Sequence, residues 1–169
     1  MRTRSRARRW PRVVLAIVGV AALGYVGLRL AARASGGPLG PIPGGRLAGP
    51  LAANQNPDWG FTDAIETIEV EVSPDDPLSV TTWVIAHHGQ LYVTADFFNP
   101  WKRWPHLALA DPRVRLRIGG EIYERSAVRV TDPREIEALR RAVAEKYDVS
   151  PDGLAAKVEV WFFRMEPRR

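Results

Sequence analysis

The chain has 169 residues, 46% of them hydrophobic, which suits one folded domain with short appendages. It contains no cysteine, so disulfides, thiolate metal sites and a cysteine nucleophile are excluded. The net charge of +5 comes from the first 53 residues, where all nine charged side chains are arginines. Subtracting these nine leaves residues 54–169 with a net charge of −4, which argues against a groove that binds nucleic acid.

An uncharged apolar run begins at Val13 and ends at Leu28, or at Ala32 if Arg29 is tolerated near its end. A helix that crosses a membrane needs about 20 residues, and the long stem of Arg29 can reach the headgroups. Six arginines precede Val13, and the positive-inside rule places them in the cytoplasm. We therefore expect a basic cytoplasmic N-terminus over residues 1–12. A single-pass signal anchor over residues 13–32 would follow in the cell (inner) membrane, with the domain outside the cytoplasm.

Two other interpretations of the apolar run stay open. Ala32-Arg33-Ala34 resembles the cleavage site of a secretory signal peptide, although Arg29 and Arg33 disfavour cleavage. The run could also be a buried core helix, which the preceding arginine cluster disfavours.

Residues 33–53 are rich in glycine and proline, above all between Gly36 and Pro50. Such a segment neither propagates a helix nor supplies regular strand hydrogen bonds. We expect an extended linker between the membrane and a domain formed by residues 54–169. The alternative is a loop that packs on the domain through Leu39, Ile42 and Leu47.

Most of residues 54–169 show strand patterns, with alternating apolar and polar side chains or runs of β-branched residues. The predicted strands are residues 65–72, 78–87, 90–95, 113–118, 121–130 and 157–164. His88-Gly89 and Gly119-Gly120 both fit two-residue hairpin turns. The second turn would place Arg115 opposite Glu124, which predicts a cross-strand ion pair that explains part of an arginine stripe.

Two predicted helices interrupt the strands. One begins after Asp132, a suitable N-cap, and Glu135 completes the spacing of a capping box. Its apolar stripe follows at Ile136, Leu139, Val143 and Tyr147. A short helix over residues 104–110 ends before Asp111-Pro112. Six antiparallel strands with two helices predict a mainly β fold, a closed or split six-stranded barrel preceded by one transmembrane helix.

Several segments together resemble the FMN-binding split-barrel superfamily. They are Tyr92-Val93-Thr94-Ala95, Lys102-Arg103-Trp104, residues 107–114 and Ile118-Gly119-Gly120. The order is similar to that of pyridoxamine 5'-phosphate oxidase-like proteins. The spacing from Trp104 to Asp111-Pro112 is similar to that of deazaflavin-dependent nitroreductases.

The resemblance implies a cofactor, either FMN or the deazaflavin F420. Lys102, Arg103 and Thr94 would hold its phosphate, and Trp104, with Trp101, would stack on its ring. The activity implied is an oxidoreductase that acts on a small acceptor such as a quinone or a nitro compound. Relatives in this superfamily are commonly dimers, so the resemblance also implies a homodimer.

A second interpretation is a non-catalytic binding or structural module at the membrane surface that has lost the cofactor. Pro105 and Leu107 stand where the nitroreductases usually have tyrosine and asparagine, which favours this interpretation. The tryptophans would then be core residues or membrane anchors, and Lys102-Arg103 a solvated loop. We predict no metal site, since the adjacent His87 and His88 would point to opposite faces of a strand.

Overall fold

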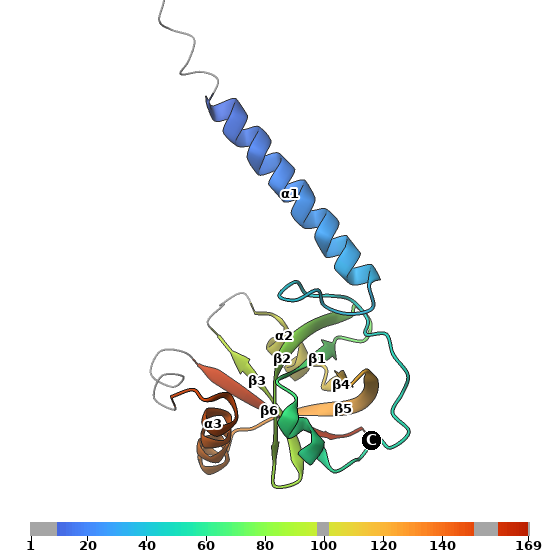
Figure 1. Ribbon diagram of the computed structural model, residues 1–169, viewed down its shortest axis with the longest axis vertical. Helices are drawn as coiled ribbons and strands as arrows, with labels where there is room; N and C mark the ends of the chain where they lie inside the picture. Colours follow the sequence, from blue (N-terminus) through green and yellow to red (C-terminus); the bar gives the residue numbers. More distant parts are fainter. Residues whose placement is uncertain (1–9, 98–101, 151–158, 169) are drawn as a thin grey trace, which may run out of the picture.

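A computed structural model describes residues 10–97, 102–150 and 159–168 of the chain (Figure 1). The helices are α1 (Trp10–Ala34), the 3-10 helix η1 (Trp59–Ala64), α2 (Trp104–Ala110) and α3 (Pro133–Tyr147). The strands are β1 (Thr67–Val72), β2 (Leu78–His87), β3 (Gln90–Asp96), β4 (Arg113–Ile118), β5 (Glu121–Arg129) and β6 (Val160–Pro167).

The six strands close into one barrel in the order β1-β2-β3-β6-β5-β4, and every neighbouring pair is antiparallel. This confirms the predicted six-stranded antiparallel barrel. Closure leaves no exposed sheet edge, which is one way in which a small β domain avoids pairing with other chains.

The hairpin between β4 and β5 forms where the sequence predicts it. Gly119 and Gly120 both have positive φ angles, 59° and 88°. Such angles match a tight turn whose twist suits the flanking strands, and glycine adopts them without a steric penalty. The resulting register pairs Arg115 with Glu124, as predicted.

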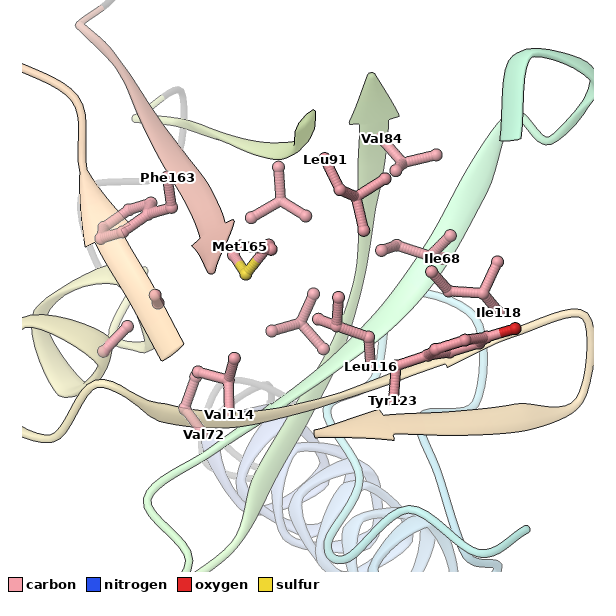
Figure 2. Close-up of a cluster of buried hydrophobic side chains, with 14 of the residues drawn as sticks. Ile68, Val72, Val84, Leu91, Val114, Leu116, Ile118, Tyr123, Phe163 and Met165 are labelled. Atoms are coloured by element: carbon pink, nitrogen blue, oxygen red, sulfur yellow. The ribbon is translucent and has the colours of Figure 1, made fainter. Parts of the chain in front are cut away.

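Two apolar clusters hold the barrel. The first fills its interior, where inward-facing side chains from all six strands meet (Figure 2). Val84, Leu91 and Phe163 are completely buried there. The second cluster joins the outer face of the barrel to α3 through Leu139 and Val143, both fully buried. This confirms the inward stripe of the predicted helix.

Asp132 caps α3 by accepting a hydrogen bond from the Arg134 amide at 2.8 Å, as the sequence predicts. The carboxylate of Glu135 reaches the barrel, where it accepts from the Tyr92 hydroxyl at 2.9 Å and from Arg164 at 3.1 Å. The capping residue thus starts the helix, and Glu135 ties it to β3 and β6.

The predicted last strand, residues 157–164, is partly wrong. Residues 157 and 158 lie outside the described part of the chain, and β6 continues beyond Arg164 to Pro167. The extension forms because Met165 is buried and Glu166 pairs with Ser126 of β5. Pairing with a neighbour therefore sets the end of this strand.

The glycine- and proline-rich segment packs on the barrel, so the packed-loop alternative describes it better than a free spacer. Leu47 is 1% exposed, and Gly44 forms an isolated bridge with Ser79 of β2. A Cβ atom at Gly44 would lie 2.2 Å from the Gly37 carbonyl oxygen, so only glycine permits this close approach.

The arginine stripe of β4 holds this segment in place. Arg117 forms an ion pair with Glu69 and donates to the carbonyls of Gly36 and Ala48 at 2.7 and 2.8 Å. The predicted ion pair between Arg115 and Glu124 is wrong. Arg115 pairs at 3.0 Å with Glu71, because β4 also borders β1 and the Glu71 side chain is buried there.

Helix α1 extends away from the barrel as a single long rod (Figure 1). Its most apolar stretch is not buried against the rest of the protein, and its length and composition suffice to cross a membrane. A signal sequence has the same properties. At its end, Arg33 forms an exposed ion pair with Asp76 at 2.6 Å.

Candidate functional site

Two cavities meet at Lys102, the residue at the start of the segment that leads into α2. The larger has a volume of about 640 Å³ and lies between the end of α1, residues 40–43, β2 and the start of α2. The smaller has a volume of about 330 Å³ and lies between β1, β2, β3 and β6. Thr81 and Lys102 line both cavities, so the two spaces adjoin.

Three cationic side chains, Arg29, Lys102 and Arg103, line the larger cavity. Tyr25, one helical turn before Arg29, lines the same wall. A cavity of this size matches those that hold small ligands, and its cations favour an anionic group.

Lys102 is already engaged. Its ammonium donates to the Asp96 carboxylate at 2.7 Å, and the side chain is 23% exposed. A charge-assisted hydrogen bond of this length is strong and fixes the ammonium at the junction of the cavities. An incoming phosphate would have to share Lys102 with Asp96.

Arg103 differs from Lys102 in both exposure and pairing. Its side chain is exposed, and it makes no hydrogen bond or ion pair to any residue within the described ranges. Its backbone carbonyl accepts from the amides of His106 and Leu107 at 3.1 Å and starts α2. The guanidinium is therefore available to a ligand in the larger cavity.

The other predicted cofactor residues are largely covered. Trp104 lines the larger cavity but is only 3% exposed, and its ring packs at 5.5 Å from that of Phe163. It can form part of the wall, but its ring face is occupied by the core. Thr94 lines the smaller cavity at 5% exposure. Trp101 lies outside the described residues.

The histidines lie in two places, and the expectation that His87 and His88 point to opposite faces is wrong, because the turn at His88, with its φ of 48°, brings the two rings together. His87 and His88 sit at the β2–β3 turn with ring centroids 4.1 Å apart. Burial, followed by the charge of His88, lowers the pKa of His87. His106 packs against Trp161 at 5.1 Å. The described residues contain no group of three or more histidine or acidic side chains that could hold a metal ion.

The structure thus brings Lys102, Arg103 and Trp104 to one cavity and Thr94 to its neighbour. Sequence analysis did not assign Tyr25, Arg29 or Thr81 to the site. Arg29 belongs to the apolar run and Thr81 to a strand, and no local pattern links either residue to Lys102. Only packing of the α1 end beside β2 and α2 places them together.

No family model and no curated protein sequence matches this chain. Solved structures with the same fold include the conserved hypothetical protein Rv2991 from Mycobacterium tuberculosis. It has a TM-score of 0.52 and 19% identity, with 64% of this chain and 77% of that chain covered. HutZ, the heme storage protein from Vibrio cholerae, has a TM-score of 0.52 and 14% identity, with 64% and 86% covered.

A third structure, described as a domain-swapped dimer, has a TM-score of 0.50 and 17% identity. It covers 64% of this chain and 90% of its own. At such identities the likeness shows the fold alone, which is the six-stranded antiparallel barrel that the sequence predicts.

Proposed function

We propose that this chain is a membrane-anchored split-barrel oxidoreductase that binds FMN or a deazaflavin at the paired cavities. The observation that carries the proposal is the cluster of Arg29, Lys102 and Arg103 around one cavity of about 640 Å³. The donor set fits a cofactor that carries a phosphate, because guanidinium and ammonium groups are strong phosphate donors.

Each residue of the site has a distinct task in this proposal. Arg103 binds the phosphate, since its guanidinium has no partner within the described chain. Lys102 adds a second charge from a position fixed by Asp96. Trp104, buried against Phe163, closes the wall and excludes water. The bound cofactor supplies hydride chemistry, so the side chains need only bind and orient.

The proposed anchor, α1, determines where the site lies relative to the membrane. Because Tyr25 and Arg29 of α1 line the cavity, a membrane-spanning α1 would hold the site at the lipid surface. A small acceptor such as a quinone or a nitro compound suits this position. A carbonate wash of membranes tests the anchor. Full-length chain should stay in the pellet, and its release into the supernatant would contradict anchoring.

A homodimer is part of the same proposal. It is supported by the similar fold of a protein described as a domain-swapped dimer. Light scattering of the full chain in maltoside micelles should give the mass of two copies after subtraction of the detergent. A mass of one copy would contradict the homodimer, and the cofactor site would still be tested separately.

A non-catalytic binding module at the membrane surface is the second candidate function. Two observations favour it: the ammonium of Lys102 is already paired with Asp96, and Trp104 offers no open ring face. Under this candidate the chain keeps the barrel and its anchor. The cations then bind no cofactor and instead interact with the membrane surface.

Titration of the full chain in maltoside micelles distinguishes the two candidates. FMN and the deazaflavin F420 are added separately, with tryptophan fluorescence and cofactor absorbance as readouts. Heme is a third arm, because HutZ has a similar fold. We expect saturable binding of FMN or F420 that weakens at least about tenfold in Lys102→Ala/Arg103→Ala.

Arg134→Ala is the matched control. Arg134 is exposed on α3 and lines neither cavity. Its removal should leave the affinity unchanged. Absence of any response to FMN and F420, with the barrel still folded by circular dichroism, would overturn the oxidoreductase proposal and favour the binding module.

A further inference from the structure

Strand β5 carries a buried arginine, Arg125. Arg125 follows the same alternation as Tyr123 and Ala127, whose side chains belong to the interior cluster (Figure 2 shows Tyr123). It is 1% exposed and is the largest of the fully buried side chains in the described part of the chain. A guanidinium in this position is unusual, since charged groups are rarely buried without a partner.

The partners of Arg125 cover only part of its guanidinium. Nη1 donates to the Asn56 side-chain oxygen at 2.8 Å, and the group lies 4.8 Å from the ring centroid of Trp59. Nε and Nη2 are buried and have no hydrogen-bond partner among the residues that the structure describes. No carboxylate in those residues forms an ion pair with Arg125.

The unpartnered atoms define what they would bind. Nε and Nη2 form one edge of the planar guanidinium, with two N–H bonds that point in the same direction. This edge matches the two oxygens of a carboxylate or a phosphate in a bidentate arrangement. Burial lowers the pKa of Arg125, yet an arginine remains protonated in proteins, so the positive charge persists.

A cavity of about 270 Å³ borders this group, lined by Asn56, Arg125 and Arg168 among others. Arg168 provides a second cation at the rim, where it pairs with Glu124 at 3.2 Å. The amide of Gln55 is fully used, since it accepts from the Glu124 amide and donates to the Ala52 and Ile122 carbonyls. Gln55 therefore has no free donor for a ligand, and the cationic side chains in the lining of this cavity are Arg125 and Arg168.

We propose that this cavity is an anion site that takes one carboxylate or phosphate group on the Nε–Nη2 edge of Arg125, with Arg168 at its rim. It shares no lining residue with the two cavities at Lys102 and does not depend on the proposed cofactor. Binding there would neutralise the buried charge and stabilise the barrel.

The test measures the melting temperature of the full chain in maltoside micelles. Inorganic phosphate and acetate are titrated separately, with sodium chloride keeping the ionic strength constant. A response to phosphate alone identifies a phosphate site, and a response to acetate alone identifies a carboxylate site. At ten times the dissociation constant the melting temperature should rise by about 5 °C. Arg125→Met should abolish the rise, whereas Arg134→Met should retain it.

Phosphate could also bind at Lys102, so the titration is repeated in Lys102→Ala/Arg103→Ala. Persistence of the rise in this variant supports the Arg125 site, and its loss there assigns the response to the cofactor cavity and overturns the inference. An equal rise in Arg125→Met also overturns it.

If Arg125→Met does not fold, the wild-type chain still decides the question by NMR. The Arg125 Nε–Hε resonance is identified by its absence from Arg125→Lys. Saturable movement of this resonance with phosphate or acetate supports the site. No movement with either anion, at concentrations that reach about 50 mM, contradicts it.

Discussion

The arginines on the two faces of the β4–β5 hairpin differ in how fully their guanidinium groups are paired. On the outer face, Arg115 and Arg117 each pair with a carboxylate of β1. Each also donates to backbone carbonyls of residues 36–52 in the glycine- and proline-rich segment, here called the 36–52 segment. On the inner face, Arg125 has one side-chain oxygen and an aromatic ring, and two of its nitrogens have no partner in the described chain. Pairing, more than the number of arginines, separates structural cations from candidate binding groups.

The same distinction applies at the cavity beside α2. Lys102 is paired with Asp96, whereas Arg103 is exposed and has no side-chain partner within the described residues. We therefore expect paired cations to affect stability when they are removed. Removal of an unpaired, exposed cation should affect ligand binding and leave stability nearly unchanged.

The largest stability loss should follow Arg115→Leu. This change removes the nearer cation from the Glu71 carboxylate, which is 2% exposed, and leaves it with Arg46 at 3.8 Å and the Leu47 amide at 2.7 Å. Removing one member of a buried pair costs up to about 3 kcal/mol, because the other charge stays buried and here keeps only a more distant cation. Urea unfolding in maltoside micelles measures the loss. A loss below about 1 kcal/mol would show that Glu71 does not need Arg115.

A smaller loss, about 2 kcal/mol, should follow Arg117→Leu. The variant loses the ion pair with Glu69 and both hydrogen bonds to the 36–52 segment. Because that segment is then less tightly held, trypsin should cleave after the exposed Arg46 faster than in the wild type. Arg134→Leu is the control. Equal cleavage rates in all three proteins would show that Arg117 does not hold the 36–52 segment on the barrel.

Lys146 lies between the paired and the unpaired cations, since within the described residues its ammonium donates only to neutral carbonyls, those of Thr62 and Val84, at 2.8 Å. Burial lowers its pKa below 10.5, the ordinary value for a lysine. The unfolded chain then binds more protons in the window just below pH 10.5, so stability rises with pH there. Lys146→Met should lack this rise. Urea unfolding at pH 8 and pH 10 measures the change in stability. The same change in the wild type and in Lys146→Met would contradict the assignment to Lys146.

The smallest stability change is expected for Arg103→Ala, within about 0.5 kcal/mol of the wild type. Arg103 is exposed and has no side-chain partner in the described part of the chain. Its effect should appear in cofactor affinity, as at least about a tenfold loss. A large loss of stability with no change in affinity would reverse the comparison between paired and unpaired cations.

Much of the fold follows from local sequence signals. Glycines at positions 119 and 120 specify a hairpin, and Asp132 with Pro133 specifies the start of α3. The bounds of β2, β4 and α2 match the predicted residue ranges. These features are predictable because each depends on residues that are close together in the chain.

Long-range pairing was not predictable in the same way. Register placed Arg115 opposite Glu124, but barrel closure brought β1 and Glu71 to its other side. Packing likewise decided that the 36–52 segment lies on the barrel and that Arg29 lines the cavity. Arg125 did carry a signal, since it alternates with Tyr123 and Ala127. A charged residue on an inward face was the sign of a special site.

The central claim is that the cations at Lys102 recognise a phosphate, and pairs of ligands with and without that group test it most directly. Dissociation constants are measured in micelles for FMN against riboflavin, and for F420 against its phosphate-free ring and ribityl core. We expect one phosphorylated ligand to bind at least about tenfold more tightly than its counterpart. The preference should vanish in Lys102→Ala/Arg103→Ala. Equal affinities within both pairs in the wild type would contradict the account.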